Sequence, residues 1–90
     1  MSGQDLDEIV CDFSRFYLLT ILYEGPHHGY SIISKFRNRI GREISPSLVY
    51  PFLSQLERQG LVKHSLKPVG KKNRKVFELT VEGKELCKTL

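Results

Sequence analysis

Cysteines are scarce in this sequence of 90 residues: there are only two, Cys11 and Cys87, near opposite ends of the chain. Small secreted folds held by disulfides carry more cysteines at closer spacings, so the pattern argues against that class. Long apolar runs are missing as well, and none approaches the roughly 18 residues of a membrane span. The first ten residues are acidic, whereas a secretory leader begins with basic residues. We therefore expect a cytoplasmic protein without a membrane segment.

Motifs of catalysis and of metal binding are absent too. The sequence has no recognisable nucleophile–base pair, no paired-carboxylate motif and no glycine-rich phosphate loop. His27, His28 and His64 are not spaced as metal ligands, and the cysteines have no nearby partners for zinc. A single domain over residues 1–90 leaves no room for a multidomain enzyme. We expect no enzymatic activity, no metal and no cofactor.

Charge is distributed unevenly along the chain, whose formal net charge is +4. Residues 25–76 carry eleven basic side chains against two acidic ones, whereas residues 1–24 carry one basic against five acidic. A basic middle between acidic ends indicates a surface that faces a polyanion such as nucleic acid. A solvated basic face without a partner would give the same pattern.

Apolar residues recur at helical spacing in three segments of the first 60 residues. This spacing predicts helices over 5–24, 29–40 and 46–59, each followed by a glycine that can end it. Within the first helix, residues 16–23 (FYLLTILY) are apolar nearly all round. We therefore expect that segment to be buried on most sides.

The third predicted helix has a clear start and one awkward residue. Ser45 is typical of an N-cap and Pro46 of the first helical position. Pro51 lies inside the helix, where it lacks an N–H group and should bend the helix or remove one hydrogen bond. The alternative is a helix that starts near Ser47, which would put Pro51 closer to the first turn, where a proline costs less.

The pattern changes from helical to alternating after residue 60. Residues 61–67 and 75–80 read as two strands, and Pro, Gly and Asn between them predict a hairpin tip over 68–74. A last helix follows over 81–90. The order of three helices, a hairpin spanning 61–80 and a helix predicts an α+β, mostly helical fold of the winged helix-turn-helix class.

A winged helix that binds DNA places its third helix in the major groove, where polar and flat side chains read base edges. The outer face of the third predicted helix has such side chains, and the hairpin (the wing) has a basic tip that would reach phosphates or the minor groove. We predict sequence-specific binding to double-stranded DNA; the alternative is a module that meets an acidic protein. The predicted DNA contacts are Lys35, Ser45, Ser47, Tyr50, Ser54, Gln55, Arg58, Lys71, Lys72, Asn73, Arg74 and Lys75.

Three segments resemble the PadR family of transcriptional regulators. ILYEGPHHGYSI (21–32) is similar to the family's L-x-x-G-P-x-H-G-Y-x-I. SPSLVYPFLSQLERQGLV (45–62) is similar to S-x-x-x-V-Y-P-x-L-x-x-L-E-x-x-G-L-V, and GKKNRKVFELTVEGKEL (70–86) to G-x-x-R-K-x-Y-x-L-T-x-x-G. The second is the most specific, because Val-Tyr-Pro inside a helix is unusual. The resemblance extends over about residues 16–90.

The resemblance implies a dimeric winged-helix repressor that binds inverted-repeat operators. It places DNA contacts at Tyr30, Ser47, Tyr50, Lys71, Lys72 and Arg74. Family members usually carry a long C-terminal dimerisation helix or domain, whereas residues 81–90 offer only a short helix. Sensing of phenolic acids or drugs therefore does not carry over, and a small-molecule effector stays unidentified.

A two-fold operator requires a two-fold protein, so we expect a homodimer formed by residues 6–20 and 81–90. The alternative is that the last helix only closes the core of the monomer. The predicted interface residues are Leu6, Ile9, Val10, Phe13, Phe16, Tyr17, Leu86 and Leu90. Cys11 and Cys87 lie in the same two helices. Two reduced, buried thiols are the expectation for them, and a disulfide within or between chains is the alternative.

Overall fold

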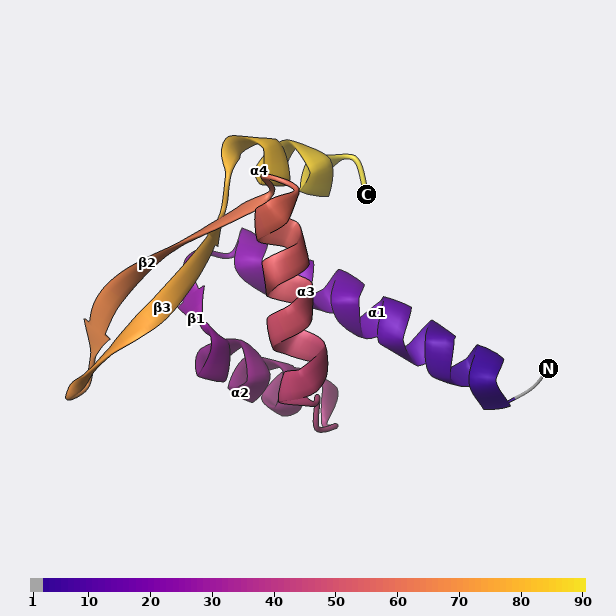
Figure 1. Ribbon diagram of the computed structural model, residues 1–90. Coiled ribbons are helices and arrows are strands. Elements are labelled where there is room, and N and C mark those ends of the chain that lie inside the picture. Colours follow the sequence, from indigo (N-terminus) through magenta and orange to yellow (C-terminus); the bar gives the residue numbers. More distant parts are fainter. Residues whose placement is uncertain (1–2) are drawn as a thin grey trace.

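The computed structural model describes residues 3–90 as four helices and a three-stranded antiparallel sheet (Figure 1). The elements are α1 (Gly3–Tyr23), β1 (His27–His28), α2 (Gly29–Ile40), α3 (Pro46–Arg58), β2 (Val62–Val69), β3 (Lys72–Leu79) and α4 (Val81–Lys88). The predicted order of helices and hairpin is confirmed, and the fold is an α+β winged helix-turn-helix.

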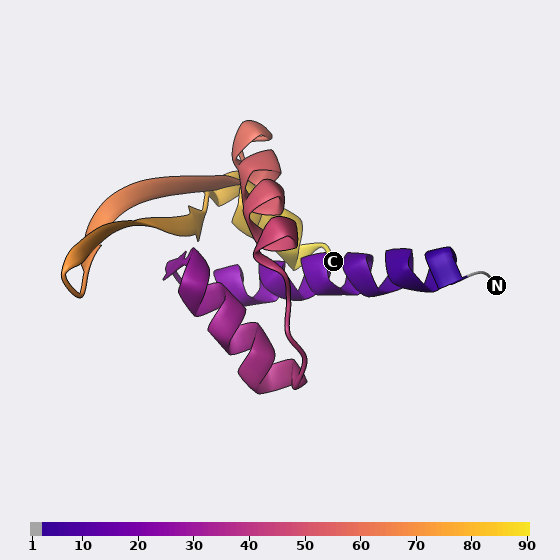
Figure 2. The same cartoon turned by 60° about the horizontal axis from the view of Figure 1, so that its bottom comes forward.

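Two parts of the chain project from a compact centre. In both views the N-terminal half of α1 extends to one side and the β2–β3 hairpin to the other (Figures 1 and 2). The molecule is accordingly elongated, with principal extents of 45 × 30 × 21 Å. The wing and the N-terminal half of α1 therefore lie on opposite sides of the molecule.

The helix boundaries follow the local signals in the sequence. Gly41 ends α2 with a φ of +80°, and its N–H donates to the carbonyl oxygen four residues earlier at 2.8 Å. Ser45 caps α3, whose first residue is Pro46, as predicted. Pro51 is accommodated inside α3, which continues to Arg58. The outer helices differ slightly from their predicted ranges, because α1 begins at residue 3 and α4 ends at residue 88.

A hydrophobic core joins α1, α2 and α3 to the base of the wing. The buried hydrophobic residues are Leu18, Ile21, Leu22, Ile32, Phe36, Ile44, Val49, Leu53, Leu56, Val62, Phe77 and Leu79. The prediction that residues 16–23 are buried on most sides was wrong at both ends of the segment. Phe16 and Tyr23 are 47% and 48% exposed, because the rest of the chain covers α1 on one side only.

The wing is a longer and tighter hairpin than predicted. β2 and β3 pair in register from Val62 opposite Leu79 to Val69 opposite Lys72. The predicted tip over 68–74 was therefore wrong, since only two residues, at positions 70 and 71, form the turn. Gly70 supplies the positive φ, +65°, that a two-residue hairpin turn needs at this position. The proline at position 68 stays in the ladder because β2 is the edge strand of the sheet.

A short third strand was not predicted. β1 pairs antiparallel with β3, His27 opposite Phe77 and His28 opposite Val76. His28 also caps α2, because its Nδ1 accepts a hydrogen bond from the N–H of Ser31 at 3.2 Å. The pairing fixes the start of α2 against the wing.

The end of the wing is bonded to both α3 and α4 through Thr80. Its N–H donates to the Leu61 carbonyl at 3.0 Å, and its Oγ1 donates to the Gly60 carbonyl at 2.7 Å. The same Oγ1 accepts from the N–H of Gly83 at 3.1 Å and so caps α4. These bonds hold α4 directly against the backbone that leaves α3.

Candidate nucleic-acid interface

The outer face of α3 is polar and open to solvent. Ser45, Ser47, Tyr50, Ser54, Gln55 and Arg58 are all exposed. Their hydroxyl, amide and guanidinium groups can bond to base edges and to phosphates. The opposite side of the helix is anchored by the buried Val49, Leu53 and Leu56. The core packing thus fixes which face α3 presents.

Two serines shape the N-terminus of α3. The Oγ of Ser45 accepts a hydrogen bond from the N–H of Ser47 at 3.1 Å, and the two hydroxyl oxygens are 2.6 Å apart. Ser45 is therefore first a capping residue, with Ser47 beside it on the outer face. The N–H groups of a helix start favour an anion, which suits a nearby phosphate.

Three elements meet around a cleft of about 220 Å³. Its lining includes Tyr50 of α3, Tyr30 of α2, and Arg74 and Lys75 of β3. Tyr30 is 62% exposed and Tyr50 is 45% exposed. The structure therefore brings together four predicted contact residues from helices and strand that are distant in sequence.

The β2–β3 hairpin, or wing, projects from the body of the molecule (Figure 2). Lys71, Lys72, Asn73, Arg74 and Lys75 are all exposed. Because side chains alternate along a strand, Lys72 and Arg74 lie on one face of β3 and Lys75 on the other. The hairpin thus presents positive charge on both faces.

One cation of the wing was missed by the sequence analysis. Lys67 stands directly opposite Arg74 in the ladder, so two like charges share one face of the hairpin. Four residues nearer the body on the same strand, Lys63 faces Glu78 instead, with Nζ and Oε1 3.8 Å apart. The signal was the glycine at position 70: a two-residue turn there fixes the register that opposes Lys67 and Arg74.

The Lys67–Arg74 pair predicts an unusual effect on stability. Lys67→Thr should raise the free energy of unfolding by about 0.2–1 kcal/mol, because it removes a cross-strand repulsion. Lys63→Thr is the matched control and should not stabilise, since it removes an attraction to Glu78 instead. Thermal unfolding at low and high salt measures both, and the gain at Lys67 should shrink as salt screens the charges. Equal changes in the free energy of unfolding for the two variants would contradict a repulsion between Lys67 and Arg74.

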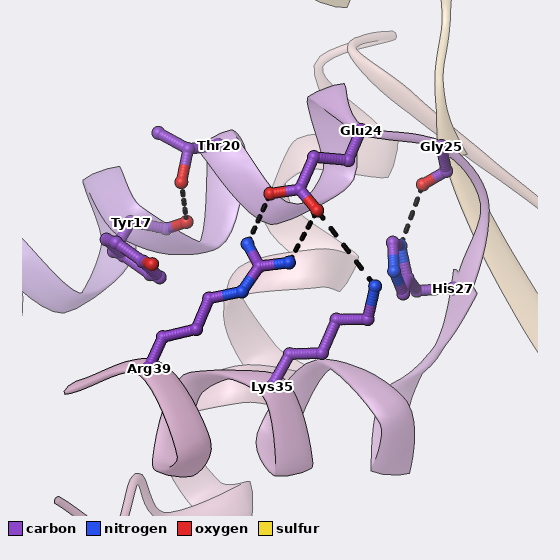
Figure 3. Close-up of polar contacts among 7 residues, drawn as sticks. All are labelled: Tyr17, Thr20, Glu24, Gly25, His27, Lys35 and Arg39. Carbon is purple, nitrogen blue, oxygen red and sulfur yellow. Dashed lines mark hydrogen bonds and ion pairs between the residues drawn. The ribbon is translucent and has the colours of Figure 1, made fainter. Parts of the chain in front are cut away.

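Lys35 lies apart from the other predicted contacts. Its Nζ is 4.0 Å from an Oε1 of Glu24 at the end of α1, and Arg39 forms two hydrogen bonds with the same carboxylate (Figure 3). In Figure 3 both cations extend from α2 toward α1. The structure therefore groups Lys35 with an ion-pair cluster that links α1 to α2, and not with the cleft or the wing.

The ion pair between Glu24 and Arg39 shifts the pKa values of the two side chains in opposite directions. The hydrogen bonds from Arg39 hold the pKa of the Glu24 carboxyl below its ordinary value, and they raise the pKa of Arg39. His27 is nearby and donates from Nδ1 to the Gly25 carbonyl at 2.8 Å. Burial lowers the pKa of His27 despite that bond. The cluster consequently keeps one carboxylate charged between two cations at the α1–α2 junction.

The projecting half of α1 exposes the apolar residues predicted for a dimer interface. Leu6, Ile9, Val10, Phe13, Phe16, Leu86 and Leu90 are exposed in the single chain. Tyr17 differs, because its ring packs edge-on against Phe36 with centroids 5.7 Å apart, so we assign it to the core of its own chain. Hollows of about 420 and 370 Å³ flank α1, the first beside Phe13 and the second beside Phe16.

The cysteines and histidines form no composite site among residues 3–90. Cys11 and Cys87 are free thiols and half-buried, and burial raises the pKa of Cys87, which disfavours the reactive thiolate. Within the described part of the chain, no group of three or more His, Cys, Asp or Glu residues could hold a metal ion. No helix in that part is long and apolar enough to cross a membrane.

Comparisons with known proteins agree with this geometry. The family model described as the transcriptional regulator PadR-like family matches residues 18–89. A transcriptional regulator from Clostridium thermocellum is 22% identical with a TM-score of 0.80, and the match covers 99% of this chain and 82% of that one. A PadR family transcription regulator from Clostridium difficile is 24% identical with a TM-score of 0.76, and the match covers 86% and 81% of the two chains.

One similar structure contains nucleic acid. Bacillus subtilis PadR, solved in complex with operator DNA, is 28% identical to this chain with a TM-score of 0.73. The match covers 83% of this chain and 43% of that one. Among curated proteins, none matches the sequence.

Proposed function

This chain belongs to the PadR-like family of transcriptional regulators, and from that membership we propose that it binds a specific double-stranded DNA sequence and represses transcription there. Because the family consists of regulators, the chain is not an enzyme, as the sequence predicted. A cytoplasmic location, where DNA is accessible and thiols stay reduced, is part of the proposal.

The observation that carries the proposal is the continuity of the exposed face of α3 with the basic wing across the cleft at Tyr50. The cleft is lined by Tyr30 and Tyr50 on the helices and by Arg74 and Lys75 on the wing. A helix in the major groove with a basic hairpin over the adjacent backbone is the arrangement that winged helices use on DNA. Repulsion between Lys67 and Arg74 would be relieved by a phosphate, which supports an anionic partner.

In this proposal the side chains have different tasks. Tyr50, Ser54, Gln55 and Arg58 read base edges, because they lie on the outer face of α3. A second group of side chains binds the sugar–phosphate backbone: Tyr30, Ser47, Lys67, Lys71, Lys72, Asn73, Arg74 and Lys75. Lys35 binds a phosphate only where that phosphate competes with Glu24 for the ammonium group of the lysine.

We further propose that the chain acts as a homodimer on an inverted-repeat operator. The apolar side chains along one half of α1 would remain in water in a monomer, and such a patch typically marks an interaction surface. A second copy related by two-fold symmetry would cover the patch and present two α3 helices to two half-sites. Leu86 and Leu90 of the last helix extend the same proposed interface.

The dimer can be tested at Phe13, which is 51% exposed in the single chain. Phe13→Glu should raise the dissociation constant of the dimer by about a hundredfold or more, because both copies would bury a charge. Light scattering coupled to size exclusion at micromolar concentration measures the change. Leu66→Glu is the control: Leu66 is equally apolar and 67% exposed, but it lies on the wing. A wild-type chain that is monomeric at this concentration would sink the proposed dimer.

Selection of bound sites from random duplex DNA tests the proposed function as a whole. We expect an enriched sequence with two inverted half-sites about one helical turn apart. Enrichment of a single half-site would contradict the dimeric mode. No enrichment, together with little affinity for duplex DNA at low salt, would favour the alternative of an acidic protein partner. A reporter gene placed behind the enriched site then distinguishes repression from activation.

A further inference from the structure

The ring of Tyr50 occupies the space that a side chain at position 29 would need. Gly29 is the first residue of α2, is buried, and its φ lies outside the left-handed region that favours glycine. A Cβ at this position would lie 2.5 Å from the Oη of Tyr50, 2.6 Å from its Cε1 and 2.7 Å from its Cζ. Such distances are too short for any real contact. The ring of Tyr50, and not the backbone of α2, therefore excludes a side chain here.

The contact joins two helices that the proposed function treats differently. Tyr50 lies on the outer face of α3 and is 45% exposed, whereas Gly29 lies at the start of α2, which β1 and β3 hold in place. A tyrosine side chain has two main torsions, and the backbone of Gly29 limits where its ring can lie. The ring thereby gains a fixed position beside Arg74 and Lys75 in the cleft.

We infer that Gly29 is a positioning residue for DNA recognition: the space left by its missing side chain seats the Tyr50 ring and so sets the direction in which α3 presents it to the groove. This inference rests on the proposed function, because it concerns how that surface reads DNA. It adds a residue that would not itself contact DNA but would control one that does.

The effect of a methyl group at position 29 can be derived from the contact. The clashing atoms belong to the far end of a flexible side chain, so the ring of Tyr50 can swing away without unfolding the protein. Alanine has fewer unfolded conformations than glycine, which favours folding where the native φ is not positive, as here. Gly29→Ala should therefore displace the ring of Tyr50 while the fold persists. The expected effect is a weaker preference for the specific DNA sequence.

The first arm of the test needs no DNA. In protein labelled with 3-fluorotyrosine, the ¹⁹F resonance of Tyr50, assigned through Tyr50→Phe, should move in Gly29→Ala much further than those of Tyr17 and Tyr23. Thermal unfolding of a double-mutant cycle completes this arm. Gly29→Ala should raise Tm by a few degrees in a Tyr50→Ala background and fail to do so in the wild type. Equal changes of Tm in both backgrounds, or an unmoved Tyr50 resonance, would overturn the inference.

The second arm uses the site enriched from random DNA and a scrambled duplex at the same salt. Gly29→Ala should lose about tenfold of the preference for the enriched site, while affinity for the scrambled duplex stays within about twofold. In the Tyr50→Ala background the same change should cost no further preference. Preference equal to that of the wild type would overturn the inference. If the wild type itself prefers no sequence, the proposed function fails, and the first arm alone decides whether Gly29 seats Tyr50.

Discussion

Gly83→Ala should destabilise the chain by about 2–3 kcal/mol and lower Tm by more than about 10 °C. A Cβ at position 83 would lie 2.1 Å from the carbonyl oxygen of Leu61 and 3.1 Å from a methyl group of Leu79. The Leu61 carbonyl belongs to the backbone and already accepts the N–H of Thr80, so it cannot move without breaking that bond. Helix α4 would instead have to lift off the base of the wing.

The control for this prediction lies one residue further along α4. Lys84 is exposed, and Lys84→Ala should change the stability by less than about 0.5 kcal/mol. Differential scanning calorimetry of the three proteins gives the comparison. A Gly83→Ala protein that melts within about 2 °C of the wild type would show that α4 can shift freely and that its cap at Thr80 contributes little.

The helices and their limits could be predicted because their signals are local. Ser45 with Pro46 marks the start of α3, and Gly41 marks the end of α2, within a few residues of sequence. The inner stripe of α3 follows from helical spacing, and the structure buries Val49 and Leu53 as that spacing requires. The exposed face of α3 then follows as the complement of the buried one.

Features that depend on distant pairing could not be predicted in the same way. β1 has two residues, too few for an alternating pattern, and it exists because β3 lies beside it. The roles of Gly29 and Gly83 depend on the residues of other elements that come close to them. The opposition of Lys67 and Arg74 needs the register of the hairpin. In each case the role of the residue depends on a neighbour that is distant in sequence and comes close only in the folded chain.

The wing lysines should give the largest effect on DNA binding. Lys71→Ala combined with Lys72→Ala should weaken binding to enriched and scrambled duplexes alike, by about a hundredfold at 0.1 M salt, because a dimer would lose four phosphate contacts. The slope of log affinity against log salt should fall by about four for the same reason. Both side chains are exposed at the end of the projecting hairpin, so the fold should be unaffected.

Lys84→Ala combined with Lys88→Ala is the control with the same change of net charge, placed on α4 at the other end of the wing. Because Lys88 lies beside Phe16 and Leu90 of the proposed dimer interface, light scattering must first show that this variant keeps the oligomeric state of the wild type. The control should leave the salt slope nearly unchanged, because only cations that contact phosphates release counterions on binding. Tyr50→Ala should show the complementary result, a loss of preference for the enriched site with a salt slope close to that of the wild type. If the wing variant altered sequence preference while its salt slope stayed that of the wild type, the division of tasks between α3 and the wing would be wrong.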